Sequence, residues 1–460
     1  MPTISRRQLV LIVTENLLLT AACVAAVRAR LGPGATGTLL RPGGSLCVGL
    51  FVITCQLCLY YQDLYDLRVL ANPKDLAVRA MNGVGVSALV LAALYVCFPR
   101  LNLERGVFLF TLALLVAVVV SWRVAFRWAT RAANASHRLL IVGTNATAVQ
   151  LARELYDRRE EFGVEIVGFI DPDPARIGAP VLNPGVVGAV PDIPAIVRSR
   201  AVDRVVLGLS DERGKLPMEQ FLAMRVEGIR FEPLVSVYET FTGKIAVENL
   251  RPSWLVFSGG FRRSGLSLAG KRLLDLVLAG GGLILASPLL AVAALAVRAT
   301  SAGPILFHQQ RVGQHGRVFT VHKLRSMRLD AEAGTGPVWA SRGDPRVTGV
   351  GRLLRRTRID EIPQLWNVLV GDMSLVGPRP ERPEFVADLA HQIPFYGQRH
   401  VVKPGVTGWA QVRYRYGACV SDALEKLQYD LYYIKHMSPV FDLFIVFETA
   451  KTVLLGRGAQ

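Results

Sequence analysis

Residues 352–367 read Arg352-Leu-Leu-Arg-Arg-Thr-Arg-Ile-Asp-Glu-Ile-Pro-Gln-Leu-Trp-Asn367. Two adjacent carboxylates in this stretch, Asp360 and Glu361, follow four arginines. Pro363 suits the first turn of a helix, and apolar residues at helical spacing come after it, so we expect the acidic pair at or just before a helix N-terminus. The free N–H groups of such a terminus stabilise carboxylate and phosphate alike.

Two carboxylates surrounded by cations can act as nucleophile and metal ligand on a phosphate ester. The alternative is a capped helix whose charges form surface ion pairs, and a bare Asp-Glu pair would favour that alternative. The motifs on either side of the pair decide between the two interpretations.

Eight motifs in one order accompany the acidic pair. They are Gln310–Gly313, Phe319–Met327, Asp344–Thr348, Gly351–Arg356, Pro363–Val368, Gly371–Pro380, Lys403–Val412 and Lys426–Tyr433. In this order they resemble the bacterial sugar transferases, the monotopic phosphoglycosyl transferases that start polysaccharide assembly on a polyprenyl phosphate. The resemblance covers residues 266–460. It departs from the family pattern at Arg358 and Ile359, where the family commonly has Ser-Leu.

The resemblance implies transfer of a hexose-1-phosphate from a UDP-sugar to undecaprenyl phosphate, with release of UMP. Asp360 would then be the nucleophile that carries a phosphosugar-aspartyl intermediate, and Glu361 would bind Mg²⁺. Four further positions match residues that the family places around the substrate phosphates: Lys323, Arg355, Arg379 and Asp430. Structural alternatives are a strand-edge charge for Lys323, a solvated helix face for Arg355 and a simple ion pair for Asp430. Arg379 lies between two prolines, and this restrained backbone suits a fixed phosphate clamp.

The composition indicates a membrane protein. The chain has 460 residues, of which 51% are hydrophobic, and its mean hydropathy is +0.34. The net charge of +17 suits either nucleic acid or an anionic lipid surface with anionic substrates. The apolar runs favour membrane lipid, so no nucleic-acid partner is expected. Most cysteines lie in or beside those runs, where they are expected to pack rather than to form disulfides or bind zinc.

Four apolar stretches open the chain, and each approaches the ~20 residues that span a bilayer as a helix. They are Leu9–Val27, Ser45–Tyr61, Met81–Phe98 and Val107–Val120. Lys and Arg are denser before the first stretch, between the second and third, and after the fourth, which places both ends of the bundle in the cytoplasm. Residues 1–130 are therefore predicted to form a four-helix transmembrane bundle, and the resemblance implies the bacterial inner membrane with the catalytic domain facing the cytoplasm.

Residues 137–240 show the alternation of strands and helices that is typical of a parallel sheet. Residues 137–148 are expected to form a strand, a tight turn and the start of a helix that continues through Tyr156, and further strands are expected at 164–170 and 203–209. Gly143 follows the first strand, but Asn145 and Ala148 stand where a dinucleotide-binding fingerprint has glycines. A Rossmann-like module with a structural or regulatory role is therefore favoured, followed by a linker at 241–265.

Residues 266–460 are predicted to form the catalytic domain. Its apolar run Leu276–Val297 is long enough to span a bilayer, but Ser287-Pro288 kinks a helix near its middle. Hydropathy alone predicts a fifth span, whereas the resemblance implies a re-entrant membrane helix over residues 266–298. Near the C-terminus, the apolar helix expected over 440–455 suits the membrane interface, packing on the re-entrant helix, or an ordinary core position.

The predicted fold class is thus a membrane α-helical bundle, an α/β Rossmann-like domain and an α/β-mixed monotopic catalytic domain with a re-entrant helix. A homo-oligomer is compatible with the sequence. One competing interpretation is a membrane-tethered nucleotide-sugar dehydratase or epimerase, which needs an intact glycine fingerprint and normally a Tyr-x-x-x-Lys pair. Another is a non-catalytic membrane scaffold, against which the undamaged Asp360-Glu361 pair argues.

Overall fold

The computed structural model describes most of the chain in two compact units, Pro2–Leu234 and Val235–Gln460. The described residues are 6–32, 35, 37, 42–66, 73–99, 105–132, 137–159, 163–208, 216–247, 259–261, 264–328, 331, 344–414 and 419–455. The first unit holds a helical bundle and an α/β domain, and the second holds the Asp360-Glu361 pair.

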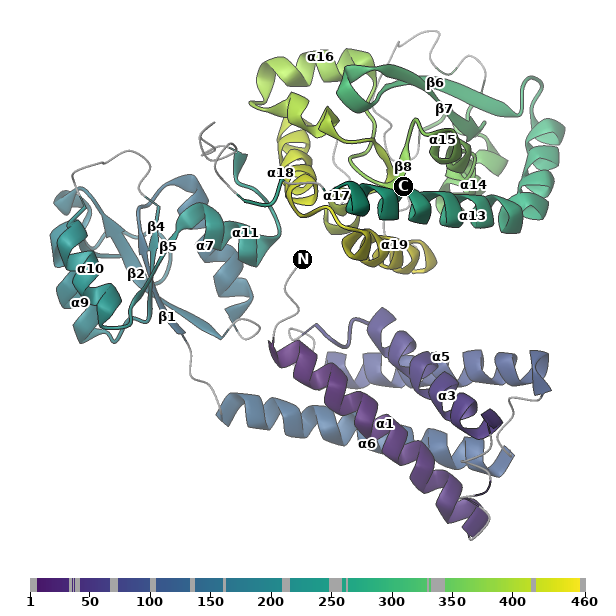
Figure 1. Ribbon diagram of the computed structural model, residues 1–460, viewed down its shortest axis with the longest axis horizontal. Coiled ribbons are helices and arrows are strands. Elements are labelled where there is room, and N and C mark those ends of the chain that lie inside the picture. The colour runs from purple at the N-terminus through teal and green to yellow at the C-terminus, as the bar shows by residue number, and fades with distance from the viewer. Residues whose placement is uncertain are drawn as a thin grey trace. The chain divides into compact units, whose positions relative to one another are not determined.

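Four helices form the bundle at the start of the chain (Figure 1). They are α1 (Arg6–Leu31), α3 (Pro42–Tyr61), α5 (Pro73–Cys97) and α6 (Arg105–Ala132). The first three contain segments long and apolar enough to cross a membrane, and α6 contains the shorter apolar segment Leu114–Phe126. Leu19, Phe51, Leu91 and Val119 are among the buried side chains of their common core. The four expected stretches are confirmed as helices, each longer than its apolar run.

A buried ion pair joins the first and last helices of the bundle. Arg123 Nη2 lies 2.9 and 2.8 Å from the two carboxylate oxygens of Glu15, and both residues are completely buried. Tyr65 donates a hydrogen bond to the same carboxylate, and Arg123 also donates to the Leu64 carbonyl. An ion pair inside an apolar bundle is tolerated when its charges are paired and hydrogen-bonded, as the Glu15 carboxylate and both terminal nitrogens of Arg123 are here. Glu15, which interrupts the first apolar stretch of the sequence, thus has its partner on α6.

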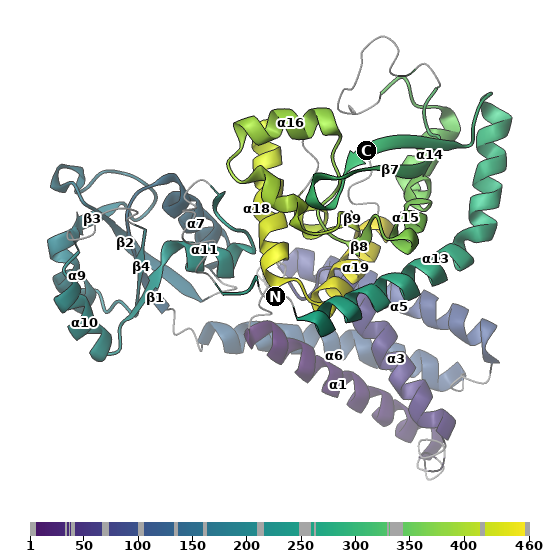
Figure 2. The ribbon, with the colours of Figure 1, turned by 45° about the horizontal axis from the view of Figure 1, so that its top comes forward.

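The α/β domain is built on a parallel sheet of strand order β3-β2-β1-β4-β5. Its elements are β1 (His137–Val142), α7 (Ala146–Asp157), β2 (Val164–Asp171), η3 (Pro174–Arg176), β3 (Val186–Ala189), η4 (Val190–Asp192), α9 (Ile193–Ser199), β4 (Arg204–Leu207), α10 (Met218–Val226) and β5 (Arg230–Pro233). In Figures 1 and 2, α9 and α10 lie on one side of the sheet and α7 on the other. Because helices cover both faces, the middle of β1 is a continuous apolar run of completely buried residues, 139–142. The strands expected at the start of 137–148 and at 164–170 are confirmed, and the strand expected at 203–209 is present as β4, with residue 209 outside the described residues. The four-residue strands β3 and β5 were not predicted.

The C-terminal unit packs short helices around a two-stranded antiparallel ribbon and a short parallel pair. Its elements are α11 (Leu234–Thr242, in this unit from Val235), α13 (Gly265–Thr300), β6 (Leu306–Val312), η6 (Gln314–Gly316), β7 (Val318–Leu324), α14 (Gly349–Thr357), η7 (Ile359–Glu361), α15 (Gln364–Val370), β8 (Ser374–Val376), α16 (Pro383–Gln392), η8 (Tyr396–Val401), β9 (Gly405–Thr407), α17 (Trp409–Arg413), α18 (Val420–His436) and α19 (Pro439–Leu454). The core gathers around Trp409, which stacks on Tyr432 and meets Phe441 edge-on.

The long apolar helix α13 bends along its length, as Figures 1 and 2 both show. Its early turns contact α15, whereas Ala293 and Val297 pack with side chains of β7 and α14. Pro288 lies between these two contact regions, and proline kinks a helix because it cannot donate the backbone hydrogen bond. Ser287 donates from its hydroxyl to the Ile284 carbonyl at 2.8 Å, beside the proline.

Polar contacts fix the first half of α13 to the rest of the unit. Asp275 is buried and accepts hydrogen bonds from the Ser374 hydroxyl at 3.0 Å and the Leu375 N–H at 2.9 Å. Lys271 Nζ lies 2.7 Å from Asp442 at the start of α19. The helix expected over 440–455 is therefore confirmed, and it packs on α13.

The segment 235–247 packs on α18. Glu239 is buried and lies 2.7 Å from Lys435 Nζ and 2.6 Å from His436 Nε2. Residues 137–240 were expected to form the α/β domain, but the contacts of residues 235–240 place them in the C-terminal unit. Of the expected linker, residues 248–258 lie outside the described residues.

Candidate active site

The acidic pair lies in a turn between two helices. Helix α14 ends at Thr357, and Arg358 then takes a left-handed backbone conformation with φ 59°. This conformation costs a non-glycine residue roughly 1–2 kcal/mol, and such residues cluster at functional sites. Asp360 and Glu361 form the 3-10 turn η7, and Pro363 is the N-cap of α15. The expected position, just before a helix N-terminus, is confirmed.

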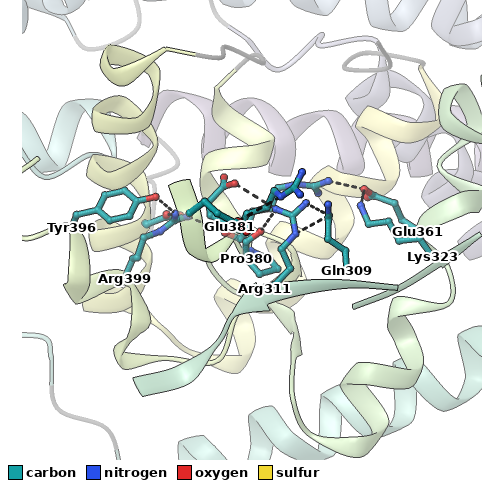
Figure 3. A network of polar contacts seen from close by, with 12 residues as sticks. Gln309, Arg311, Lys323, Glu361, Pro380, Glu381, Tyr396 and Arg399 are labelled. Carbon is teal, nitrogen blue, oxygen red and sulfur yellow. Dashed lines mark hydrogen bonds and ion pairs between the residues drawn. The ribbon is translucent and has the colours of Figure 1, made fainter. Parts of the chain in front are cut away.

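Glu361 is held by three cations. Its Oε1 lies 2.9 Å from Lys323 Nζ and 2.6 Å from Arg379 Nη2, and its Oε2 lies 3.8 Å from Arg358. Figure 3 shows Lys323 directed at this carboxylate. Burial opposes the ionisation of Glu361, but Arg379 and Lys323 outweigh it and hold its pKa well below the usual range. Glu361 is therefore ionised at neutral pH.

Asp360 has the opposite character. It is 7% exposed, and its Oδ1 is buried without a hydrogen-bond partner among the residues that the structure describes. Burial and the adjacent charge of Glu361 raise the pKa of Asp360, against the opposing effects of Lys323 and Arg355. A buried carboxylate oxygen without a partner is costly, and such a group indicates a binding or catalytic role.

The cations around the pair come from separate elements. Lys323 is on β7, where it faces Phe307 of β6, and burial lowers its pKa despite the nearby Glu361. Arg355 is on the last turn of α14 and donates from Nε to the Ser326 hydroxyl at 2.9 Å. Arg379 follows β8, with its side chain 24% exposed. The structure thus brings together the acidic pair and three of the four positions expected around the phosphates.

The fourth position, Asp430, lies apart from this cluster. It is 2% exposed on α18, and its Oδ2 accepts a hydrogen bond from Arg399 Nη2 at 2.9 Å. The ion-pair alternative for Asp430 therefore describes its contacts. Burial raises the pKa of Asp430, and Arg399 opposes this effect. In this position Asp430 has no contact with Glu361 or with the Arg379 guanidinium.

The donor set suits a metal ion only together with a substrate. Among the described residues, no group of three or more His, Cys, Asp or Glu side chains is arranged to hold a metal ion. The carboxylate of Glu361 and the unpartnered Asp360 oxygen beside it are the available ligands. Mg²⁺ commonly binds one or two carboxylates along with substrate phosphates and waters, and the acidic pair fits that kind of site.

The turn after β1 is a second place where the sequence suggested phosphate binding. Gly143 has φ 110°, and a Cβ there would lie 3.2 Å from the Gly208 carbonyl carbon. Asn145 caps α7, because its Oδ1 accepts from the Ala148 N–H at 2.8 Å, and its Nδ2 donates to the Gly208 carbonyl at 2.8 Å. Asn145 thus occupies the helix start with its own side chain, where the dinucleotide fingerprint has a glycine.

Two arginines of the site region were not predicted from the sequence. Arg399 binds Asp430, and Arg311 reaches the backbone beside Arg379, whereas Arg358, one of the four arginines noted before the acidic pair, contacts Glu361. Arg311 lies within the motif 310–313, which gave a signal without a role. Arg399 had no signal, because nothing in the sequence around it indicates that it is buried.

The arrangement suits phosphoryl transfer, because one buried carboxylate oxygen has no partner among the described residues and a second carboxylate is fixed among cations that can neutralise phosphate. Comparison with known proteins agrees with this class. Residues 266–456 match the bacterial sugar transferase model, and residues 61–215 match a model described as a CoA-binding domain.

Three relatives show how far the similarity extends. A UDP-N-acetylgalactosamine-undecaprenyl-phosphate N-acetylgalactosaminephosphotransferase of Aeromonas hydrophila is 41% identical over 271 residues, which cover 59% of this chain and 62% of that protein. A UDP-glucose:undecaprenyl-phosphate glucose-1-phosphate transferase of Xanthomonas campestris pv. campestris is 41% identical over 214 residues, 46% of this chain and 43% of that protein. An enzyme of the latter name from Caulobacter vibrioides is 46% identical over 186 residues, 40% of this chain and 69% of that protein.

The chain belongs to the bacterial sugar transferase family. It matches less than two thirds of the length of the Aeromonas and Xanthomonas proteins. The resemblance that the sequence motifs indicated is thereby confirmed.

Proposed function

We propose that this chain transfers a sugar-1-phosphate from a UDP-sugar to undecaprenyl phosphate and releases UMP. The observation that supports this function best is the Asp360-Glu361 turn, where a buried unpartnered carboxylate oxygen adjoins a carboxylate fixed by three cations. The names of the three relatives contain the same acceptor and either N-acetylgalactosamine or glucose. Because the relatives differ in this sugar, the proposal specifies a UDP-sugar as the donor and not a particular sugar.

In the proposed first step, an Asp360 oxygen attacks the phosphorus that carries the sugar. A bond forms between Asp360 and that phosphorus, the bridging P–O bond of the diphosphate breaks, and UMP leaves with the bridging oxygen. In the second step, a phosphate oxygen of undecaprenyl phosphate attacks the same phosphorus and releases the Asp360 carboxylate. Before the second step, the acceptor phosphate carries two negative charges and the adduct carries one. After it, the lipid-linked diphosphate carries two and the Asp360 carboxylate carries one, so no added acid or base is needed. A covalent intermediate lets one site take two anionic substrates in turn.

The other residues have separate roles in this proposal. Lys323 and Arg379 bind phosphate oxygens of the donor, and Arg355 favours the ionised form of Asp360. Glu361 would hold Mg²⁺ in the complex with the nucleotide sugar. The bound ion would offset the charge of the diphosphate and polarise its phosphoryl oxygens.

The proposed location is the bacterial inner membrane, with the site on the cytoplasmic side, where UDP-sugars are made. Helix α13 has the length and hydropathy of a span, and the bend near Pro288 supports a helix that enters and leaves by the same leaflet. Single introduced cysteines in the α/β domain and in α16 should react with a membrane-impermeant reagent from the same side. Reaction from opposite sides would contradict the re-entrant arrangement.

The activity is tested with membranes that contain the full chain, several UDP-sugars, undecaprenyl phosphate and Mg²⁺. We expect UMP release with at least one donor and formation of a lipid-linked sugar diphosphate. Membranes with the variant Asp360→Asn serve as the control. No UMP from any donor above that control would overturn the proposal, whereas bound NAD with no UMP release would favour a dehydratase or epimerase.

A further inference from the structure

The loop that carries Arg379 is fixed along its backbone. Four consecutive carbonyl oxygens, from Pro378 to Glu381, each accept a hydrogen bond from a residue outside the loop. The donors, in that order, are Gly405 N at 2.9 Å, Arg399 Nη2 at 3.0 Å, Arg311 Nη1 at 3.0 Å and Val312 N at 2.9 Å. Two of these bonds are therefore made by arginine side chains, on the carbonyls of Arg379 and Pro380.

Arg399 is the more deeply buried of the two donors, at 5% exposure. Its Nη1 donates to the Tyr396 hydroxyl at 2.6 Å, and its Nη2 is shared between Asp430 at 2.9 Å and the Arg379 carbonyl. Figure 3 shows Arg399 beside Tyr396 at one end of the polar network, with Glu361 and Lys323 at the other end. A buried guanidinium needs an anionic partner, and Asp430 supplies it.

Arg311, on strand β6, donates a hydrogen bond to the next carbonyl of the loop, that of Pro380. Its Nη2 donates to Gln309 Oε1 at 2.6 Å, and its Nη1 lies 3.6 Å from the Glu381 carboxylate. These contacts orient the side chain of Arg311 toward the Pro380 carbonyl. Figure 3 shows Gln309, Arg311, Glu381 and Pro380 together.

These contacts determine where the Arg379 guanidinium lies. Prolines on both sides already restrict the backbone of Arg379, and the bond from Arg399 removes the remaining freedom of its carbonyl. The guanidinium then reaches Glu361 at 2.6 Å. A donor held in place before the substrate arrives stabilises developing charge without a cost of reorientation.

We propose that Arg399, held by Asp430 and Tyr396, is a positioning residue that orients Arg379 toward the substrate phosphates. Asp430 then acts through Arg399 and not by contact with substrate. This inference rests on the proposed role of Arg379 as a phosphate clamp. It assigns a function to a buried arginine that has no contact with Glu361 or Asp360.

A double-mutant cycle in the full-length protein in membranes tests this assignment. Arg399→Met removes the guanidinium and keeps an unbranched side chain, and it is combined with Arg379→Ala. Because misplacing a catalytic contact by about 1 Å can cost on the order of 100-fold in rate, we expect Arg399→Met to lower kcat by about that factor, with a smaller effect on KM. In the Arg379→Ala background, Arg399→Met should change kcat by less than about twofold, because the residue through which it acts is absent.

A purely structural role predicts a different pattern. Glu239→Gln weakens the buried contacts of Glu239 with Lys435 and His436 in the last turn of α18, and serves as the matched control. Its effect on kcat should be equal in both backgrounds. An equal loss from Arg399→Met in both backgrounds, or no loss in either, would overturn the inference.

Two milder variants keep the test decisive if Arg399→Met does not fold. Asp430→Asn keeps an oxygen that can accept from Arg399, and Arg399→Lys keeps a donor for the Arg379 carbonyl. Each should lower kcat by about tenfold in the parent and by less than about twofold beside Arg379→Ala. If Arg379→Ala itself leaves kcat and KM unchanged, the proposed function of Arg379 fails, and that result is distinct from an additive cycle.

Discussion

The turn after β1 and the turn before α15 both place polar side chains directly before a helix. In the first turn, both polar atoms of the Asn145 side chain have partners, on Ala148 and Gly208. In the second turn, Asp360 Oδ1 is buried with no partner among the described residues. A helix start whose polar atoms are paired is complete without a ligand, whereas an orphaned carboxylate oxygen requires one.

The two turns also differ in the balance of charges around them. Beside the first turn, Asp171 accepts from the Thr144 hydroxyl at 2.5 Å and pairs with Arg176 at 3.0 Å, one cation for one carboxylate. Beside the second turn, Glu361 alone has three cations within 4 Å. An excess of fixed positive charge attracts a phosphate, and the comparison therefore supports the proposal that chemistry takes place at the second turn, whereas the first is a helix cap.

The largest expected effect is at Asp360. Asp360→Asn keeps the size of the side chain but removes the anionic nucleophile, so UMP release should fall by at least about 1,000-fold. Glu361→Gln should lower the rate less and should recover in part at high Mg²⁺. The control is Glu384→Gln on α16, a carboxylate with 57% side-chain exposure, which should change the rate by less than about twofold. Near-parental turnover in Asp360→Asn would show that the orphaned oxygen is not the nucleophile.

Metal removal is expected to have an effect of similar size. The Asp360 and Glu361 carboxylates add negative charge to that of the diphosphate, and a divalent cation is expected to offset it, so excess EDTA should reduce UMP release to background, and added Mg²⁺ should restore it. The measurement is initial rate against free Mg²⁺ concentration in washed membranes. Full turnover in excess EDTA would remove the metal from the proposal.

A smaller effect is expected in the pH dependence. Asp360 must be ionised to attack, and its pKa is raised by burial and by Glu361, so the rate should fall on acidification at a higher pH than for an ordinary aspartate. Arg355 favours the ionised form of Asp360. Arg355→Met should therefore raise this pKa further and move the acidic limb of kcat/KM to higher pH.

Arg352→Met is the matched control for this pH profile. Arg352 is exposed on the same helix as Arg355 and is not among the residues that shift the pKa of Asp360. The acidic limb of the kcat/KM profile of Arg352→Met should coincide with that of the parent protein. A limb that moves to lower pH in Arg355→Met, or not at all, would contradict the assignment of this limb to Asp360.

The smallest effect on activity is expected at the first turn. Asn145→Ala removes the cap of α7 and should destabilise the α/β domain by about 1 kcal/mol. Thermal unfolding of the purified protein should show this change, while the rate of sugar-phosphate transfer stays within about twofold of the parent. A large loss of transfer activity in Asn145→Ala would break the comparison, since the first turn would then take part in function.

Local patterns were sufficient to predict much of this fold. The four apolar stretches, the strands at 137–142 and 164–170, and the turn at Asp360-Glu361 are all marked by hydrophobic period or by turn residues within a few positions. Strands β3 and β5 were missed because β3 contains Gly188 and β5 ends in Pro233, and both residue types are depleted in strands, whereas the equally short β4 was marked by its apolar run. The family motifs led to Lys323, Arg355 and Arg379, which the structure places around the acidic pair.

Contacts between distant positions could not be predicted in the same way. Arg399 and Asp430 are 31 residues apart, and their pairing depends on how η8 packs against α18. The partner of Glu15 is 108 residues away, on α6. Such pairs depend on tertiary packing, which local sequence does not encode, and for this reason Asp430 was grouped with the phosphate residues although it contacts Arg399.

The central claim is that Asp360 carries the sugar phosphate. Purified enzyme is mixed with UDP-sugar and Mg²⁺ without undecaprenyl phosphate, quenched rapidly, and measured by intact-protein mass spectrometry followed by peptide mapping. The account predicts up to one equivalent of UMP, a mass increase of one sugar phosphate on the peptide that contains Asp360, and neither product in Asp360→Asn. An adduct on Glu361, an adduct that survives in Asp360→Asn, or UMP release that requires both substrates would contradict it.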